Sequence, residues 1–202
     1  YLASSCTYPK HAEQPMRPEM LMTGPLESTN SSYATAKLAG IELCGAYRKE
    51  YGKNFISAIP ANVFGPGDDF SMGNSHVVAG LIRKLHEAKL NGDSTVKIWG
   101  TGKPKREFIY VDDLVGACMF LMDHYNDEEP INIGSGTTFS ISVLAETIRE
   151  VTGYQGKIQF DSSKPDGMPE KVLDSTHLFS LGWEPSVDLN EAITITINWF
   201  IS

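Results

Sequence analysis

Apolar positions recur every three or four residues in several stretches of the chain, a spacing that is typical of amphipathic helices. The longest such stretch is 31–51, where Asn30 or Ser31 can cap the first turn and Gly52 can end the last. The same reasoning predicts a second helix that is capped by Asn74 or Ser75. Further helices are expected over 112–124, 140–151 and 175–181, and from residue 188 onward.

Short apolar runs lie between these helices and end at turn residues, as buried strands do. We expect strands over 55–59, 96–99, 107–111, 131–133 and 157–161, and residues 1–5 resemble the end of another strand. Because parallel neighbours need a crossover connection, this alternation predicts an α/β fold with mainly parallel pairing. The stretch 112–124 is apolar all round, so we expect its helix to be buried against the sheet.

Composition indicates a globular protein and excludes several functions. The chain has 202 residues, of which 41% are hydrophobic and 21% charged, so it can bury a core in one domain or slightly more. A net charge of -8 opposes attraction to nucleic acids and to anionic membranes. The longest apolar stretch, Leu114–Met122, is too short to span a bilayer, and no signal-peptide pattern opens the chain. We expect neither a nucleic-acid nor a membrane partner.

Cysteine and histidine usage argues against metal binding. Cys6, Cys44 and Cys118 are widely spaced and form no CxxC pair, and the five histidines form no HxxxH or HExxH pair. We therefore expect no metal site, no disulfide framework and a reducing, cytoplasmic compartment.

Tyr33 and Lys37 are the strongest local signal for catalysis. They lie four residues apart, and hence on one face of the predicted helix. A phenol has a pKa near 10 and transfers protons poorly at neutral pH until a nearby cation stabilises its anion. Many long helices carry such a pair by chance, so the pair alone leaves both interpretations open.

Two further motifs make the pattern more specific. Ser4–Lys10 follows a strand end, where hydroxyl and thiol groups of an α/β sheet face ligands, and 60–66 ends the strand that follows the Tyr-Lys helix. With 74–77 and 163–167, these segments resemble the extended short-chain dehydrogenase/reductase family along the whole chain. Within it, the chain is most similar to the branch that converts GDP-4-keto-6-deoxy-D-mannose to GDP-L-fucose by 3,5-epimerisation and 4-keto reduction with NADP(H).

The resemblance implies a role for each matching residue. Ser4 would hydrogen-bond the ketone, Tyr33 would donate its proton, and Lys37 would lower the tyrosine pKa and hold the nicotinamide ribose. Cys6 and His76 would be the acid and base of the epimerisations. Further cofactor contacts are implied for Leu2, Ala3, Ser5, Pro60, Ala61, Asn62, Val63 and His76.

For the GDP-sugar, the resemblance implies binding by Lys84, Trp99, Arg106 and Asp166. Trp99 can pack on a ring, Arg106 can clamp a diphosphate, and Asp166 can accept a sugar hydroxyl. Lys84 departs from the bacterial pattern, which has arginine, so it keeps the charge and loses bidentate geometry.

The implied fold is the C-terminal part of a Rossmann-type parallel sheet with a smaller α/β substrate-binding domain. Residues 1–66 and 107–136 would belong to the NAD(P)-binding domain, and 67–106 and 137–202 to the substrate-binding domain. No glycine fingerprint follows a predicted strand, and Gly134–Gly136 is too short a match, so we expect a fragment that lacks the N-terminal half of the nucleotide fold. Relatives commonly form homodimers through the Tyr-Lys helix and its neighbour.

Two alternatives remain open. The chain could be another nucleotide-sugar enzyme of this family, a 4,6-dehydratase or a 4-epimerase, which would not require Cys6 and His76. It could also be a non-catalytic relative that binds a nucleotide, although such a protein has no need for an acid/base set.

Overall fold

The computed structural model describes residues 1–73 and 75–202, which form two compact units. Unit 1 comprises 1–63, 107–137 and 171–186, and unit 2 comprises 64–106, 138–170 and 187–202. Both units mix helices with parallel strand pairs, which confirms the expected α/β class. No helix in the described part of the chain is long and apolar enough to cross a membrane.

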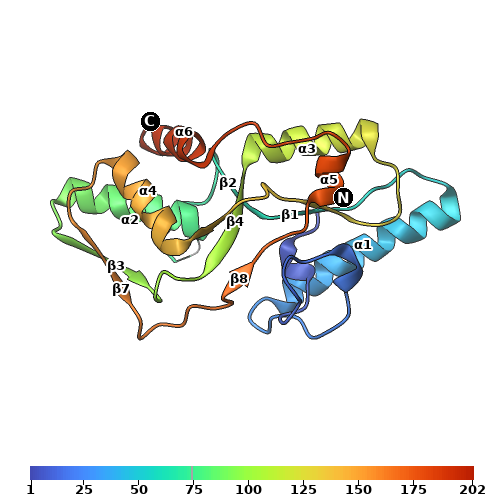
Figure 1. The fold of residues 1–202 in the computed structure, drawn as a ribbon, viewed down its shortest axis with the longest axis horizontal. Helices are drawn as coiled ribbons and strands as arrows, with labels where there is room; N and C mark the ends of the chain where they lie inside the picture. The colour runs from blue at the N-terminus through green and yellow to red at the C-terminus, as the bar shows by residue number, and fades with distance from the viewer. Residues whose placement is uncertain (74) are drawn as a thin grey trace. The chain divides into compact units, whose positions relative to one another are not determined.

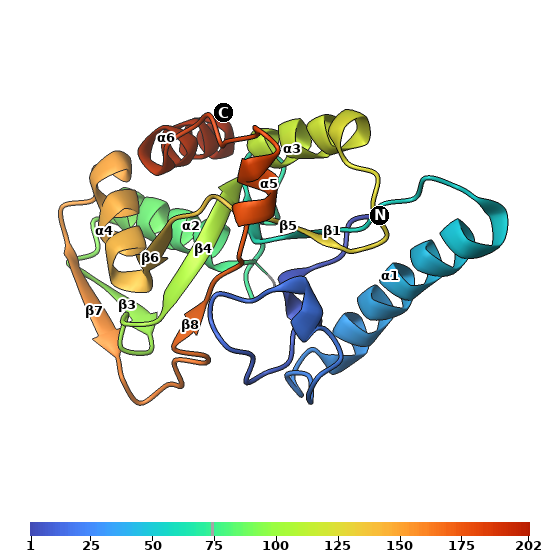
Figure 2. The ribbon, with the colours of Figure 1, turned by 45° about the vertical axis from the view of Figure 1, so that its right-hand side comes forward.

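Unit 1 is built around the parallel pair β1 (Ala58–Pro60) and β5 (Ile131–Ile133), in which Ala58 lies opposite Ile131 (Figure 2). The other elements of the unit are the short helices η1 (Ser5–Thr7) and η2 (Pro18–Met20), and the helices α1 (Ser31–Tyr51), α3 (Val111–His124) and α5 (Thr176–Ser180). Leu2 adds a single parallel bridge to Ala58. The chain start therefore joins the sheet edge, although Leu2 itself is exposed.

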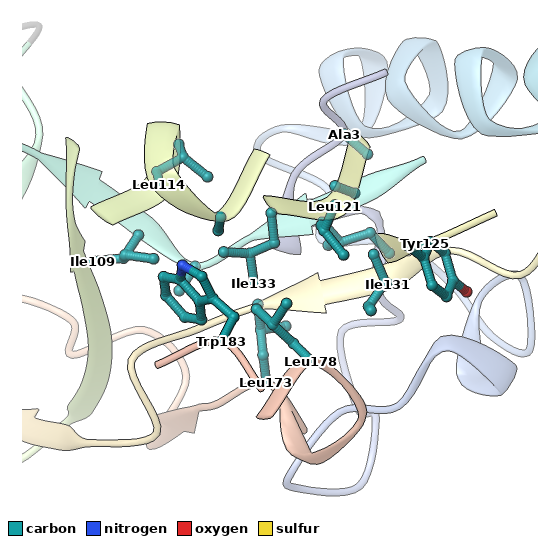
Figure 3. Packing of buried hydrophobic residues seen from close by; sticks show 14 of the residues in the cluster. Ala3, Ile109, Leu114, Leu121, Tyr125, Ile131, Ile133, Leu173, Leu178 and Trp183 are labelled. Carbon is teal, nitrogen blue, oxygen red and sulfur yellow. The ribbon is translucent and has the colours of Figure 1, made fainter. Parts of the chain in front are cut away.

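The core of unit 1 joins all three of its chain segments. Ala3, Ile133, Leu173, Leu178 and Trp183 are buried together between the strands, α3 and α5 (Figure 3). Burial of aliphatic and aromatic side chains from distant segments stabilises the unit through the hydrophobic effect.

Unit 2 contains the parallel pair β3 (Thr95–Trp99) and β7 (Lys157–Asp161), which lie side by side in Figure 1. Its other elements are α2 (Val77–Asn91), β6 (Thr138–Ser140), α4 (Ile141–Thr152) and α6 (Leu189–Ile201). Val96 and Ile98 of β3 are buried whereas Trp99 is exposed, as the alternation of a strand requires. α4 packs against both α2 and α6.

Three strands lie where the chain passes between the units: β2 (Asn62–Phe64), β4 (Lys105–Tyr110) and β8 (Glu170–Lys171). The sequence pattern did not predict β2, β6 or β8, which have two or three residues each. Segment 171–186 belongs to unit 1, whereas the expected domain division placed all of 137–202 in the substrate-binding domain.

The helix bounds follow the sequence pattern closely. α1 begins at Ser31 and ends before Gly52, whose φ of 61° is the left-handed conformation that glycine adopts at helix ends. α2 starts at Val77 with His76 as its N-cap residue, so Ser75 is not the cap, and Asn74 lies outside the described residues. The stretch 112–124 was expected to be buried against the sheet, and α3 places Leu114, Ala117 and Leu121 in the core of unit 1, whereas Met122 is 72% exposed.

Candidate active site

Ser4 and Cys6 lie in one turn at the start of unit 1. Ser4 has extended backbone angles and is the N-cap residue of η1, and its Oγ accepts a hydrogen bond from the Cys6 N–H at 3.2 Å. The Ser4 carbonyl accepts from the Thr7 hydroxyl at 2.7 Å. Because Ser4 Oγ acts as an acceptor in this turn, its O–H remains a donor for a ligand oxygen.

Tyr33 and Lys37 lie in the first two turns of α1, which contacts η1 in unit 1 (Figure 2). Lys37 Nζ is 5.8 Å from the centre of the Tyr33 ring and donates a hydrogen bond to the Leu2 carbonyl at 2.9 Å. Tyr33 is 50% exposed, so its hydroxyl can be reached by a ligand. The structure thus brings the ammonium group to the tyrosine and to the turn that carries Ser4.

The expected backbone contacts at Leu2–Ser5 lie beside this pair. The Ala3 N–H donates to the Ala58 carbonyl at 2.8 Å, which ties the turn to β1. Leu2 offers its carbonyl to Lys37, as described above. These bonds fix the backbone of Leu2 and Ala3, directly before Ser4 and Ser5.

At the end of β1, several groups of Pro60–Val63 already have partners in the protein. The Ala61 N–H donates to the Ile133 carbonyl at 2.9 Å, and the Asn62 side-chain amide donates to the Glu107 carbonyl at 2.8 Å. Val63 packs against the core of unit 1. The role of this segment in cofactor binding stays a prediction.

A lysine that no sequence motif indicated lies beside Cys6. Lys171 Nζ lies 3.5 Å from Cys6 Sγ, although the two residues are 165 positions apart. No local motif could have indicated this contact, because it depends on where β8 lies in the fold.

His76 belongs to unit 2, at the N-terminus of α2. Its carbonyl accepts from the Gly80 N–H at 2.8 Å, and its imidazole is exposed. The expected pairing of His76 with Cys6 joins residues of the two units and stays a prediction.

The four residues expected to bind the GDP-sugar all belong to unit 2. Asp166 accepts hydrogen bonds from the Thr101 N–H at 2.6 Å and from its hydroxyl at 2.7 Å, and these bonds lower the pKa of the Asp166 carboxyl. Burial lowers the pKa of Arg106, and the charge of Asp166 opposes that change. Asp166 and Arg106 are therefore electrostatically coupled.

Trp99 and Lys84 complete this set. Trp99 is 71% exposed, so a flat ring system has an aromatic surface to pack on. Lys164 Nζ lies over the same ring, 5.7 Å from its centre. Lys84 Nζ donates to the Lys97 carbonyl of β3 at 2.7 Å. This bond uses one of the three ammonium protons and leaves two for other acceptors.

Two kinds of chemistry are thus available. Unit 1 offers a hydroxyl, a phenol with an adjacent ammonium group, and a thiol with an adjacent ammonium group, which suit proton transfer at a carbonyl compound. Unit 2 offers an aromatic face, cations and a carboxylate, which suit binding of a nucleotide-sugar. No cluster of three or more His, Cys, Asp or Glu side chains able to hold a metal ion is found among the described residues.

Comparison with known sequences gives a consistent picture. The chain is 52% identical over 202 residues to a GDP-L-fucose synthase of Sinorhizobium fredii, covering 100% of this chain and 64% of that protein. It is 51% identical over 201 residues to a probable GDP-L-fucose synthase 1 of Oryza sativa subsp. japonica, covering 100% of this chain and 61% of that protein. The chain thus spans less than two thirds of the length of these relatives.

Solved structures and a family model agree with these relatives. A GDP-L-fucose synthetase from Naegleria fowleri bound to NADP matches with a TM-score of 0.92 and 33% identity, over 99% of this chain and 64% of that one. A GDP-6-OMe-4-keto-L-xylo-heptose reductase from C. jejuni matches with a TM-score of 0.90 and 31% identity, over 99% and 69% of the two chains. The model of the NAD dependent epimerase/dehydratase family matches residues 1–134. Fold, candidate site and similarity together establish that the chain belongs to the NAD dependent epimerase/dehydratase family.

Proposed function

We propose that the protein carrying this chain converts GDP-4-keto-6-deoxy-D-mannose to GDP-L-fucose with NADP(H). The observation that carries the proposal is the arrangement in unit 1, where the Ser4–Cys6 turn contacts the helix that holds Tyr33 and Lys37. Identity of about half to GDP-L-fucose synthases over the whole chain supports the same conclusion.

The reductive half of the reaction is assigned to Ser4, Tyr33 and Lys37. Ser4 donates a hydrogen bond to the C4 ketone oxygen, and Tyr33 gives that oxygen its proton. Lys37 stabilises the tyrosinate that remains. One Lys37 proton is used by the Leu2 carbonyl, and the other two fit the hydroxyl groups of a nicotinamide ribose. NADPH, when bound, supplies the hydride to C4.

The epimerising half is assigned to Cys6 and His76. Protons at C3 and C5 are acidic because they lie beside the C4 ketone, and inversion needs removal from one face and return on the other. A thiol and an imidazole both titrate near enough to neutral pH for this task. An enzyme that only reduced a ketone would not need this second acid/base pair.

We further propose that Lys84, Trp99, Arg106 and Asp166 bind the GDP-sugar. The exposed Trp99 indole offers a stacking face, and Arg106 and Lys84 offer positive charge to the diphosphate. Asp166 is held by Thr101 as an ionised acceptor for a hydroxyl group. Unit 1 would correspond to the NAD(P)-binding part and unit 2 to the substrate-binding part.

A cytoplasmic homodimer without nucleic-acid or membrane partners completes the proposal. The three cysteines are free, which suits a reducing compartment. Leu43, Tyr47 and Tyr51 expose apolar surface along α1, which suits a helical dimer interface. The net charge of -8 disfavours polyanionic partners.

Two variants of the intact protein test the two halves separately. In heavy water, Cys6→Ser should incorporate deuterium at C3 and C5 far more slowly than the wild type, as followed by NMR. Tyr33→Phe should keep that exchange and lose about a hundredfold or more in the rate of reduction, because general acid catalysis contributes about that much.

Cys44→Ser and Tyr47→Phe serve as matched controls and should behave as the wild type. Full turnover by Cys6→Ser would instead favour a dehydratase or 4-epimerase of the same family. Unchanged reduction by Tyr33→Phe would remove Tyr33 from the mechanism, and absence of any exchange or reduction in the wild type would favour a non-catalytic protein.

A further inference from the structure

Lys171 follows Glu170 in the two-residue strand β8 and has no role in the function proposed above. Its Nζ lies 3.5 Å from Cys6 Sγ, within hydrogen-bond distance for a sulfur acceptor, and both side chains are partly buried. Partial burial reduces screening by water, so the positive charge acts on the sulfur more strongly than it would at the surface.

The backbone that follows Lys171 is held firmly within unit 1. The Val172 N–H donates to the Gln14 side chain at 2.8 Å, and the Val172 carbonyl accepts from the Met16 N–H at 2.8 Å. The Leu173 N–H donates to Glu107 Oε2 at 2.9 Å. These bonds hold Val172 and Leu173, the two residues directly after Lys171, so Lys171 starts from a fixed position.

Glu107, which accepts the hydrogen bond of the Leu173 N–H, has no exposed surface, so water does not compete for this bond. Its second carboxylate oxygen accepts from the Gly136 N–H at 2.9 Å, so one buried side chain joins the turn after β5 to the segment after β8. Burial raises the pKa of Glu107, and the backbone N–H groups oppose that rise. A carboxyl group buried in this way is costly unless its hydrogen bonds are kept.

The partner of Lys171 is the residue to which the proposed function gives acid/base chemistry. A thiolate is the basic and nucleophilic form of cysteine, and a nearby ammonium group favours it over the thiol. The contact also ties the position of the Cys6 sulfur to that of the Lys171 ammonium group.

We propose that Lys171 is a positioning residue for Cys6, holding its sulfur in place and stabilising the thiolate. This inference rests on the proposed function only for the use of that thiolate. When the thiolate acts as base, the C–H bond beside the ketone breaks and an S–H bond forms. The electron pair enters the enolate, whose charge rests on the ketone oxygen. Lys171 keeps its own protons throughout.

Alkylation of the intact protein by iodoacetamide, without sugar or cofactor, tests this contact. The thiolate forms an S–C bond and iodide leaves, and peptide mass spectrometry follows each cysteine separately. We expect Lys171→Met to slow alkylation of Cys6 about tenfold at pH 7, because the ammonium group that favours the thiolate is then absent. Alkylation of Cys44 and Cys118 in the same molecules should not change.

Three further variants complete the experiment. Lys171→Arg keeps the charge and should keep rapid alkylation, whereas Lys171→Gln is neutral and polar and should match Lys171→Met; it also provides a second test if the methionine variant does not fold. Lys49→Met is the control for loss of a positive charge in unit 1, because Lys49 pairs with Glu128 at 2.6 Å and is 71% exposed. Its Cys6 should react as in the wild type.

The outcomes separate this inference from the proposed function. Unchanged Cys6 alkylation in folded Lys171→Gln would overturn the inference, and a raised KM for the GDP-sugar in that variant would then assign Lys171 to substrate binding. Slow alkylation in Lys171→Gln together with normal deuterium exchange by Cys6→Ser would support the Lys171–Cys6 contact and contradict the proposed role of the thiol.

Discussion

Asn132 of β5 joins all three chain segments of unit 1 and is the best place to test how the unit holds together. It is almost completely buried and uses its whole side-chain amide. Its Oδ1 accepts from the Tyr8 hydroxyl at 2.7 Å, and its Nδ2 donates to the carbonyls of Met16 at 2.9 Å and Asp174 at 3.1 Å. The test is Asn132→Leu, which keeps the number and branching of the side-chain heavy atoms and removes every hydrogen bond of the side chain.

The expected cost follows from these three partners. Asn132→Leu leaves the Tyr8 hydroxyl and the Asp174 carbonyl unpaired, whereas the Met16 carbonyl keeps the bond from the Asp174 N–H. Each unpaired group costs about 1–3 kcal/mol when buried, so the free energy of unfolding should fall by about 2–6 kcal/mol. Tyr8→Phe breaks only one of the bonds and should cost about 1–2 kcal/mol. Both values are large fractions of a total stability of about 5–15 kcal/mol.

Urea unfolding of the two single variants and the double variant, followed by circular dichroism, measures the coupling. Once Asn132 is leucine, Tyr8→Phe removes an unpaired hydroxyl, so the double variant should be about 1–2 kcal/mol more stable than additivity requires. Tyr51→Phe, at an exposed tyrosine of α1, is the control and should be neutral. Additive costs within about 0.5 kcal/mol would refute the reasoning.

Two other predictions concern stability. Burial raises the pKa of Tyr125 to about 12, so the stability that the protonated side chain contributes is complete below its ordinary value near pH 10 and is lost as the pH rises towards 12. In urea unfolding, the free energy of unfolding of Tyr125→Phe relative to that of the wild type should therefore be higher at pH 11 than at pH 8. A difference that is the same at both pH values would contradict this. A Cβ at Gly134 would meet the buried Glu107 carboxylate, so Gly134→Ala should cost about 1–3 kcal/mol. Gly116→Ala in α3, where the nearest atom is Trp183 Nε1 at 3.9 Å, should instead stabilise by about 0.4–1 kcal/mol. Thermal unfolding compares the two alanine variants, and an unchanged midpoint for Gly134→Ala would count against the expected clash.

The amino-acid sequence predicted the features that depend on near neighbours along the chain. α1 runs from Ser31 to Tyr51 as its apolar spacing and Gly52 require, and Asp188 caps α6 by accepting from the Glu191 N–H at 2.9 Å. The pairing of Tyr33 with Lys37 is equally local, because residues four apart share a helix face. Such features are fixed by helix geometry and do not need the rest of the fold.

The exposure of helix faces was not predictable in the same way. Periodicity shows how many sides of a helix are apolar, and it does not show how many sides the protein covers. The apolar residues of 112–124 predicted burial against the sheet, and the structure buries only one face of α3, because Met119 and Met122 lie exposed. Tertiary packing decides which apolar side chains are buried.

The sequence by itself determined the α/β class, the long helix and the residue types of the candidate site, because these follow from spacing, capping and motif. Only the tertiary structure decided that Lys171 meets Cys6, that Asn132 joins three segments, and that Glu107 anchors the chain beside Lys171. These contacts join residues that are 42 to 165 positions apart, and no local pattern encodes them. They form because buried polar groups must find partners, and in a folded chain those partners come from distant segments.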